Sequence, residues 1–340
     1  MSNESKKPEW VELVKKYQKP DTKKALWQVI NTLVPYIIMW YLMFQALEVS
    51  YWLVLPVAVV CAGLHIRLFI FQHDCGHNSF FPSKQWNNRL GGLLGILTLT
   101  PFAYWRKTHA VHHANSGNLD FRGIGDVETL TVKEYFDKDW KGRFAYRFFR
   151  HPLVTFGIGP AFVFFLRQRV PYDIPKEWKR ERSSVYKTNV GIAILLLTAG
   201  YLLGFKEFFT LYITMMLMAT SAGVWMFYVQ HQFEDTYWRY RKEWDYEKAA
   251  LDGSSFYKLP KILQWFTGNI GFHHIHHLAP RIPNYLLEQA HYENTLFQNV
   301  ETLTVWSSLR TMFLDLWDEE QDRLISFRNA RKLKSQGAAG

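Results

Sequence analysis

The sequence predicts an all-α membrane protein whose four transmembrane helices form two hairpins, joined to a helical cap on the cytoplasmic side. Three observations lead to this prediction. Four apolar runs approach or exceed the length that crosses a bilayer, the runs lie close together in two pairs, and Lys and Arg gather outside them. Because backbone amides in lipid must bond within their own segment, each span is expected to be a helix.

The first hairpin is expected to contain spans at residues 25–47 and 51–71, which are joined by the short sequence "EVS". About 20 residues cross the ~30 Å hydrocarbon core, so both runs are long enough. Residues 1–24 before them are polar and basic, and they lack the early apolar region of a secretory signal. We expect these residues to form a cytoplasmic N-terminal segment.

The second hairpin is expected to contain spans at residues 189–205 and 208–229, of which the first is a little short. Two other apolar runs, residues 91–104 and 153–166, are shorter still and each contains a proline. Their length suits interfacial or re-entrant helices better than spans.

The Lys and Arg residues set the expected orientation. Seven precede the first span, 18 lie between the second and third, and 13 follow the fourth. Because cytoplasmic loops are enriched in Lys and Arg, both termini and the middle loop are expected in the cytoplasm. The membrane domain would comprise residues 25–295, and residues 296–340 would form a cytoplasmic C-terminal segment. The net charge of +10 is then explained by topology and by attraction to anionic lipid headgroups, so nucleic acid is not an expected partner.

Most of the 13 histidines fall into short clusters with helical spacing. The clusters read "HDCGH", "HAVHH" and "HHIHH", and a further histidine lies in "YVQHQFED" after the fourth span. Residues i, i+3 and i+4 share one face of a helix, so the histidines of one cluster can converge. The residues concerned are His73 and His77; His109, His112 and His113; His273, His274, His276 and His277; and His231.

All of these histidines are expected on one side of the membrane. His73 follows the second span and His231 follows the fourth, both at cytoplasmic ends, and the other clusters lie in cytoplasmic segments. The second helix is therefore expected to continue past the bilayer and to carry His73 and His77 to a metal site.

Neutral imidazole is a common ligand of Zn, Cu, Fe and Ni. The clustered imidazoles exceed the about four to six ligands that one ion takes, so the cytoplasmic cap is expected to hold a histidine-ligated di-metal site. A structural zinc site usually includes cysteine, and a catalytic one uses three protein ligands and a water. The pattern therefore favours a redox-active pair that activates O2, with iron preferred and copper or manganese left open.

Several polar residues leave alternatives open. His274 is rotated by about 100° from His273 on a helix, so it is either a ligand or an outer contact. His65 and His151 lie apart from the clusters and are expected to be interfacial or solvated.

Other side chains could support the ligands or form a different site. Glu288 and His291 make one E-x-x-H pair, which only weakly indicates a di-iron carboxylate bundle because such bundles use two pairs. A ligating imidazole usually donates its other N–H to an acceptor. The candidate partners are Asp74, Asn115, Asn269, Glu234 and Asp235, each of which could equally be a solvated polar residue.

The motifs resemble the three histidine boxes of the integral-membrane fatty acid desaturases. "HDCGH", "HAVHH" and "HHIHH" follow one another in the family's order, and "YVQHQFED" is similar to the additional histidine site after the last membrane helix. The three residues between His73 and His77, and the histidine that opens the third box, are most similar to acyl-lipid desaturases of the Δ12 or ω6 type. No "HPGG" signature of a fused cytochrome b5 domain is present.

The resemblance implies an O2-dependent desaturase that introduces a cis double bond into a long-chain fatty acyl lipid. It implies two Fe ions as cofactor, O2 as co-substrate, and a ferredoxin-like or cytochrome b5-like external electron donor. By the same resemblance, the three boxes would form the catalytic centre and would ligate the metal together with His231. The implied ligands are His73, His77, His109, His112, His113, His231, His273, His276 and His277.

Two other functions fit parts of the pattern. A di-iron membrane hydroxylase or ketolase would share the histidine boxes, and only its products would distinguish it. A histidine-rich membrane metal carrier or sensor belongs to a different class. Transporters usually place ionisable groups near the midplane of their spans, whereas the expected spans here hold only His65 and Arg67, near a cytoplasmic end. This placement argues against a carrier.

Overall fold

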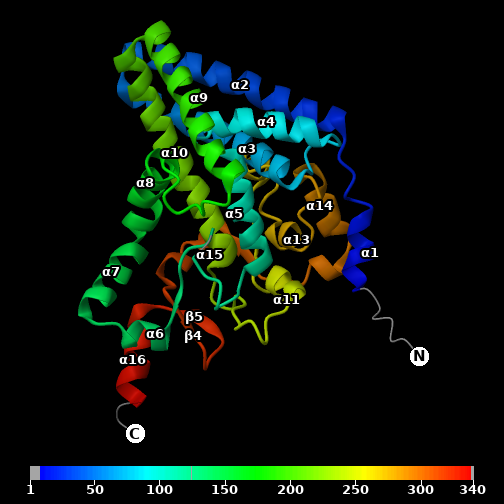
Figure 1. The fold of residues 1–340 in the computed structure, drawn as a ribbon, viewed down its shortest axis with the longest axis vertical. Helices are drawn as coiled ribbons and strands as arrows, with labels where there is room; N and C mark the ends of the chain where they lie inside the picture. Colours follow the sequence, from blue (N-terminus) through cyan, green and yellow to red (C-terminus); the bar gives the residue numbers. More distant parts are fainter. Residues whose placement is uncertain (1–7, 124, 338–340) are drawn as a thin grey trace.

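The computed structural model describes residues 8–123 and 125–337. This part of the chain is mostly helical, and four of its helices are long and apolar enough to cross a membrane, which confirms the predicted fold class (Figure 1). By its helices the protein is a multi-pass membrane protein. The four helices are α2 (Thr22–Val49), α3 (Tyr51–His77), α9 (Lys179–Leu203) and α10 (Phe205–His231).

A single residue, Ser50, separates α2 from α3. Its backbone is extended, and its hydroxyl accepts a hydrogen bond from the amide of Trp52 at 3.3 Å, which caps the start of α3. Helix α3 continues past Phe71 to His77 and ends where Asn78 takes a left-handed conformation with φ of 55°. Asparagine tolerates this conformation better than most residues, so the helix stops directly after the first histidine cluster.

Gly204 alone separates α9 from α10, with φ of 86°. A Cβ atom at this position would lie 2.5 Å from a carboxylate oxygen of Glu207. A glycine is therefore required where the second hairpin reverses direction. Helix α9 begins at Lys179, well before its apolar part, so its first turns project beyond the bilayer.

Helices α3 and α10 form the centre of the membrane part, and α2 and α9 lie outside them. In the most apolar stretch of each helix, 50% of the residues of α3 and 44% of those of α10 are buried. The corresponding shares are 17% for α2 and 22% for α9. Side chains on the outer helices, such as Trp27 and Ile37, are more than half exposed. The two central helices are also the two that end in histidines, His77 and His231.

The two shorter apolar runs form no straight span. The run at residues 91–104 is divided between α4 (Lys84–Leu97) and α5 (Phe102–Asn115). The run at residues 153–166 forms η1 (Val154–Ile158) and α8 (Gly159–Phe165), and this segment is bent by 58° from the preceding helix α7 (Trp140–Arg150).

The remaining described elements are short. Most of them lie around the histidine-bearing ends of α3 and α10, with α1 at the side of the molecule beside α14, and α16 lies at the end away from the α9–α10 turn (Figure 1). The helices are α1 (Glu9–Lys15), α6 (Val132–Asp137), η2 (Arg167–Arg169), α11 (Tyr246–Leu251), α12 (Lys261–Phe266), α13 (His273–Leu278), α14 (Asn284–Glu293), η3 (Thr295–Phe297), α15 (Val305–Ser308), η4 (Thr311–Phe313) and α16 (Phe327–Gly337).

Two small sheets, which the sequence did not predict, join distant segments of the cap. One has the order β1-β4-β5, with β1 parallel to β4 and β4 antiparallel to β5, and the other pairs β2 with β3 in parallel. In the second sheet Phe256 is opposite Thr302, and Lys258 is opposite Thr304. The strands are β1 (Leu130–Thr131), β2 (Phe256–Lys258), β3 (Thr302–Thr304), β4 (Leu316–Asp318) and β5 (Arg323–Ile325).

Candidate metal centre

Eight histidines form two neighbouring groups, each with the geometry to hold a metal ion. Within each group, one possible ligand atom from every residue lies within 4.8 Å of the others. We call them the first and the second histidine group. The first comprises His73, His77, His109, His113 and His276, and the second comprises His112, His231 and His277.

Four helices supply these side chains. The last turns of α3 and α10 enter from the membrane side, and α5 and α13 cross beside them. On α5, His113 belongs to the first group and His112 to the second. On α13, His276 and His277 are divided in the same way, and the rings of His113 and His277 stack with centroids 4.2 Å apart. Adjacent residues on a helix point about 100° apart, so each of these helices can serve both groups.

Several ring nitrogens lie within hydrogen-bond distance of one another, and neutral imidazoles cannot satisfy all of these contacts. The Nε2 atoms of His113 and His276 are 3.0 Å apart, and those of His113 and His109 are 3.1 Å apart. In a neutral imidazole each ring nitrogen is either a donor or an acceptor. His113 Nε2 can therefore make a full hydrogen bond with His109 or with His276, but not with both.

Other nitrogens of the two groups are buried without any hydrogen-bond partner. They include Nε2 of His77, His112 and His277. Buried polar atoms in a protein are normally paired, and a metal cation would accept the lone pairs that these nitrogens offer. The donor set therefore fits a di-metal site.

Four of the histidines are held in the neutral form that binds metal. Burial, followed by the charges of neighbouring histidines, lowers the pKa of His109, His113, His276 and His277 well below the usual value. Desolvation disfavours the imidazolium ion, and a second imidazolium nearby would repel it. At neutral pH the ring nitrogens therefore keep their lone pairs available for coordination.

Acceptors on the far sides of three rings fix their orientation. His73 Nδ1 lies 3.2 Å from Asp74 Oδ1, while Asp74 Oδ2 accepts hydrogen bonds from the backbone and side-chain nitrogens of Asn284 at 2.7 and 2.9 Å. His231 Nδ1 lies 3.2 Å from the carbonyl oxygen of Gly253. Such contacts select the tautomer that turns the other ring nitrogen towards the metal.

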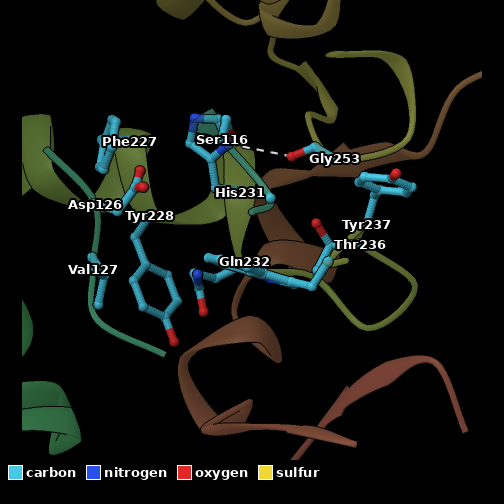
Figure 2. Close-up of a pocket in the computed structure, with 12 residues that line it drawn as sticks. Ser116, Asp126, Val127, Phe227, Tyr228, His231, Gln232, Thr236, Tyr237 and Gly253 are labelled. Carbon is cyan, nitrogen blue, oxygen red and sulfur yellow. Dashed lines mark hydrogen bonds between the residues drawn. The ribbon is translucent and has the colours of Figure 1, made fainter. Parts of the chain in front are cut away.

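The third acceptor, Asp126, was missed by the sequence analysis. Its carboxylate contacts Nδ1 of His112, and its side chain lines a narrow cavity beside His231 and Gly253 (Figure 2). It lies in a loop directly after Gly123 and Gly125, and this loop carries no histidine motif. Sequence spacing alone therefore gives no signal that links it to His112.

The third histidine cluster is divided in a way that the sequence left open. His273 is outside both groups as defined by the 4.8 Å limit, but its Nε2 atom lies 2.9 Å from Nε2 of His231. His274 points elsewhere: its Nε2 atom lies 2.9 Å from the carbonyl oxygen of Phe297 and 3.4 Å from Nδ1 of His291. His274 thus belongs to neither histidine group in this structure.

The histidines outside the clusters have other surroundings. The expectation that His65 is interfacial or solvated is wrong, because it is 4% exposed and its Nδ1 atom lies 3.1 Å from the hydroxyl of Tyr36. It lies in the part of α3, residues 61–77, in which no residue is exposed. His151 is exposed, as expected. Glu288 contacts Lys261, and His291 packs beside His274, so this E-x-x-H pair joins neither histidine group.

Of the five polar partners considered for the ligands, only Asp74 lies at a ligand histidine. The amide of Asn115 bonds to the carbonyl of Val111, that of Asn269 bonds to the carbonyl of Asn284, and Glu234 pairs with Arg323. Asp235 is exposed.

Comparisons with known proteins agree with this geometry. A family model described as fatty acid desaturase matches residues 50–302. A fatty acid desaturase of Bacillus subtilis is 44% identical over 312 residues, which cover 92% of this chain and 88% of the relative. A chloroplastic omega-3 fatty acid desaturase of Brassica napus is more distant, at 29% identity over 255 residues that cover 70% of this chain and 60% of the plant protein. An sn-1 acyl-lipid omega-3 desaturase (ferredoxin) of Synechocystis is 28% identical over 256 residues, or 70% of this chain and 67% of the relative.

Proposed function

We propose that this chain, which belongs to the membrane fatty acid desaturases, introduces a cis double bond into the acyl chain of a membrane lipid, using O2. Membership of this family makes it an oxidoreductase of lipid metabolism. The observation that carries this proposal is the pair of histidine groups, side by side, at the ends of the two central membrane helices.

The proposed ligands are the eight histidines of the two groups together with His273. Its ring is included because it faces His231 at 2.9 Å, inside the distance at which two ligands can share one ion. The two groups and His273 then offer nine imidazoles, and no carboxylate is required among them.

Nitrogen ligands without thiolate suit iron, copper or manganese, and we propose two iron ions. When bound, they would supply the redox chemistry by which O2 and two external electrons remove hydrogen from unactivated CH2 groups. The protein contributes position. Asp74, Asp126 and the carbonyl of Gly253 hold the rings of His73, His112 and His231, and burial keeps bulk water from the ligand nitrogens.

The proposed substrate is a long-chain fatty acyl lipid of the surrounding bilayer. Several buried side chains near the histidines on the central helices are apolar, including Phe71 and Cys75 on α3 and Met226 and Val229 on α10, although the polar Gln72, Asp74 and Gln230 are buried beside them. An acyl chain that enters between the membrane helices would meet a surface of matching polarity, whereas a polar substrate would lose its hydration there.

We further propose that the metal centre, both termini and residues 296–340 face the cytoplasm, with the membrane domain at residues 25–295. The concentration of Lys and Arg in the segments outside the hairpins supports this orientation. The electron donor would then be a soluble or membrane-attached cytoplasmic carrier of the ferredoxin or cytochrome b5 type. The name of the Synechocystis relative mentions ferredoxin, which supports the first of these types.

The test is expression of the chain in a bacterial host that lacks its own desaturase, followed by gas chromatography of the membrane lipids. We expect new monounsaturated acyl chains with the wild type and none with His109→Ala. The matched control is His151→Ala, which alters an exposed histidine outside both groups and should give wild-type unsaturation. Hydroxylated or keto lipids without new double bonds would contradict the proposal.

The metal is tested separately on the purified protein. Elemental analysis should find about two irons per chain in the wild type and in His151→Ala. Zinc in stoichiometric amounts after expression in iron-replete medium would contradict a redox role for the histidine groups.

A further inference from the structure

Helix α7 presents an apolar face that no other described part of the chain covers. Trp140, Phe144 and Phe148 follow one another at intervals of four residues and therefore lie along one side of the helix. Their exposed fractions are 68%, 67% and 57%. Three large aromatic side chains in one row are far more apolar surface than a single helix of a soluble cap normally leaves to water.

The opposite side of α7 carries Tyr146 and Arg150, which are buried, and residues beside the aromatic row also bond to the protein, so the aromatic face cannot turn inwards. Arg143 donates to the carbonyl oxygen of Lys138 at 2.5 Å, and Arg147 Nε donates to the hydroxyl of Tyr135 at 2.6 Å. At the end of the helix, the buried guanidinium of Arg150 donates to the carbonyl oxygen of Leu314 at 2.6 Å. These bonds fix the rotation of α7 about its axis.

We propose that α7 lies in the headgroup region of the bilayer, parallel to the membrane plane, with Trp140, Phe144 and Phe148 inserted among the acyl chains. The first argument is continuity with a membrane-facing surface. The exposed apolar side chains continue beyond α7, at Leu153 (73%) just before η1, at Ile158 (63%) in η1 and at Phe162 (51%) in α8.

The η1–α8 segment packs directly on the spanning helix α10. The ring of Phe156 lies 4.9 Å from that of Trp225 and 5.0 Å from that of Tyr228, measured between centroids. Trp225 and Tyr228 belong to the last turns of α10, shortly before His231. The apolar strip therefore starts at the level where α10 leaves the membrane, and α7 extends it sideways.

The charges of α7 fit a lipid surface. All four of its charged residues are basic, namely Lys141, Arg143, Arg147 and Arg150. An interfacial helix typically combines basic side chains, which reach the phosphates, with a row of bulky apolar residues that enters the acyl region. Tryptophan is also enriched at the membrane–water boundary.

Two other arrangements of α7 are less compatible with these contacts. A continuous span through α7 and α8 would carry all four cations into the hydrocarbon region, and the 58° bend between the two segments breaks such a span. A second copy of the chain could cover the aromatic face. The exposed apolar side chains, however, continue from α7 along η1 and α8, so such a copy would also have to displace lipid from this neighbouring surface.

The position of α7 bears on the metal centre. Arg150 also donates to the hydroxyl of Tyr228 at 2.9 Å and to Oε1 of Gln232 at 3.2 Å, on either side of His231 in the chain. If α7 is anchored in the headgroup region, these bonds hold the end of α10, and therefore His231, at a fixed distance from the headgroups.

The experiment uses the full-length protein in lipid vesicles, with a nitroxide label on a single introduced cysteine at a time. The variants are Trp140→Cys, Phe144→Cys and Phe148→Cys, with Tyr240→Cys as the control on an exposed cap loop. The native Cys61 and Cys75 are fully buried and should not react. Collision of each label with O2, which concentrates in lipid, and with a water-soluble nickel chelate reports its depth.

We expect the three α7 labels to collide more with O2 and less with nickel than the control label, and to give similar depths. A helix that spanned the membrane would instead place residues 140 and 148 about 12 Å apart in depth, which would overturn the proposal. Nickel accessibility equal to that of the control would overturn it in favour of a solvated helix. Spin–spin broadening that disappears on dilution with unlabelled protein would overturn it in favour of a contact between copies.

Discussion

At the scale of single residues, the contact between Asp126 and His112 depends on a glycine. Gly125 has φ of 76°, and a Cβ atom on it would lie 3.1 Å from Cβ of His112 and 3.3 Å from the carbonyl oxygen of Thr108. Only a residue without a side chain lets the loop approach α5 so closely. The loop can thus deliver a carboxylate to the ring from outside the histidine clusters.

Asp126→Ala should weaken metal binding by about 10- to 100-fold, because the ring of His112 loses the acceptor that orients it. The measurement is a titration of the iron-loaded protein with a competing chelator. The control is Asp120→Ala in the same loop, where the carboxylate accepts a hydrogen bond from the amide of Arg241 at 2.8 Å and touches no histidine. Equal chelator midpoints for the two variants would show that Asp126 does not support the site.

A second residue-scale prediction concerns pH. Burial raises the pKa of Asp315 from 3.8 to about 6, although Arg150 and the amide of Phe327 oppose the shift. The folded state therefore binds this proton more tightly than the unfolded state. The contribution to stability is fully present below pH 3.8 and is lost as the pH rises through about 6, with a limit of about 3 kcal/mol for a shift of this size.

Asp315→Asn cannot ionise, so its stability relative to the wild type should increase between pH 4 and pH 7 and stay constant above that range. Thermal unfolding in detergent across this range is the measurement. Asp322→Asn, on an exposed turn where the carboxylate pairs with Arg239, is the control and should show no such increase. A difference between Asp315→Asn and the wild type that does not change with pH would refute the assignment.

At the scale of elements, the histidines are placed by where helices end and by how they cross. Helix α3 ends at the left-handed Asn78 directly after His77, and α10 ends at His231. Helix α5 must then lie across these ends. Its first residue, Phe102, packs on Gly91 of α4, and Ala103 donates its amide hydrogen to Ser184 of α9 at 3.1 Å. Contacts outside the histidine groups therefore hold His109, His112 and His113 in position.

Gly91→Ala should lower the thermal stability and loosen the metal site, because the added Cβ would overlap the ring of Phe102. Overpacking of this kind costs roughly 1–3 kcal/mol. Gly92→Ala is an unusually close control, since it adds the same atom one residue later with nothing within 4 Å. In a helix position with open space around the added atom, this change should be neutral or slightly stabilising.

Unfolding midpoints and iron content of the two variants, measured in the same detergent, decide the question. If Gly91→Ala matches Gly92→Ala in both, the contact between α4 and α5 has no part in placing α5.

At the scale of the whole molecule, two membrane hairpins and the cap meet at the metal centre. The first histidine group draws on α3, α5 and α13, and the second on α5, α10 and α13, so both hairpins and the cap contribute to one site. Bound metal would join these three parts, because ions that bind only the folded state add their binding free energy to its stability.

Removal of iron by a chelator should therefore lower the unfolding temperature of the purified protein, and added Fe²⁺ should restore it. Added Mg²⁺ should not restore the unfolding temperature, because Mg²⁺ prefers oxygen ligands. The double variant His77→Ala/His112→Ala, with one ligand removed from each group, should show little of this response. His151→Ala should respond like the wild type. An unfolding temperature that is the same with and without iron would contradict a metal-joined fold.

Much of this architecture could be predicted because the information is local. The length of an apolar run predicts a span, and the i, i+3 and i+4 spacing of His109, His112 and His113 predicts a shared face. Continuation of α3 beyond the bilayer follows from the unbroken run of residues that leads to His77. These features need no knowledge of which other segment lies nearby.

The sequence by itself determined the four spans and the chemistry of the histidine clusters, since both depend on residue type and on spacing along one helix. Only the tertiary structure decided that His274 turns to Phe297, that His65 is buried against Tyr36, and that Asp126 reaches His112. It also decided which histidine of α5 and α13 joins which group. Each of these outcomes depends on the direction in which one helix crosses another, and the free energy that fixes a crossing comes from packing between segments far apart in the chain.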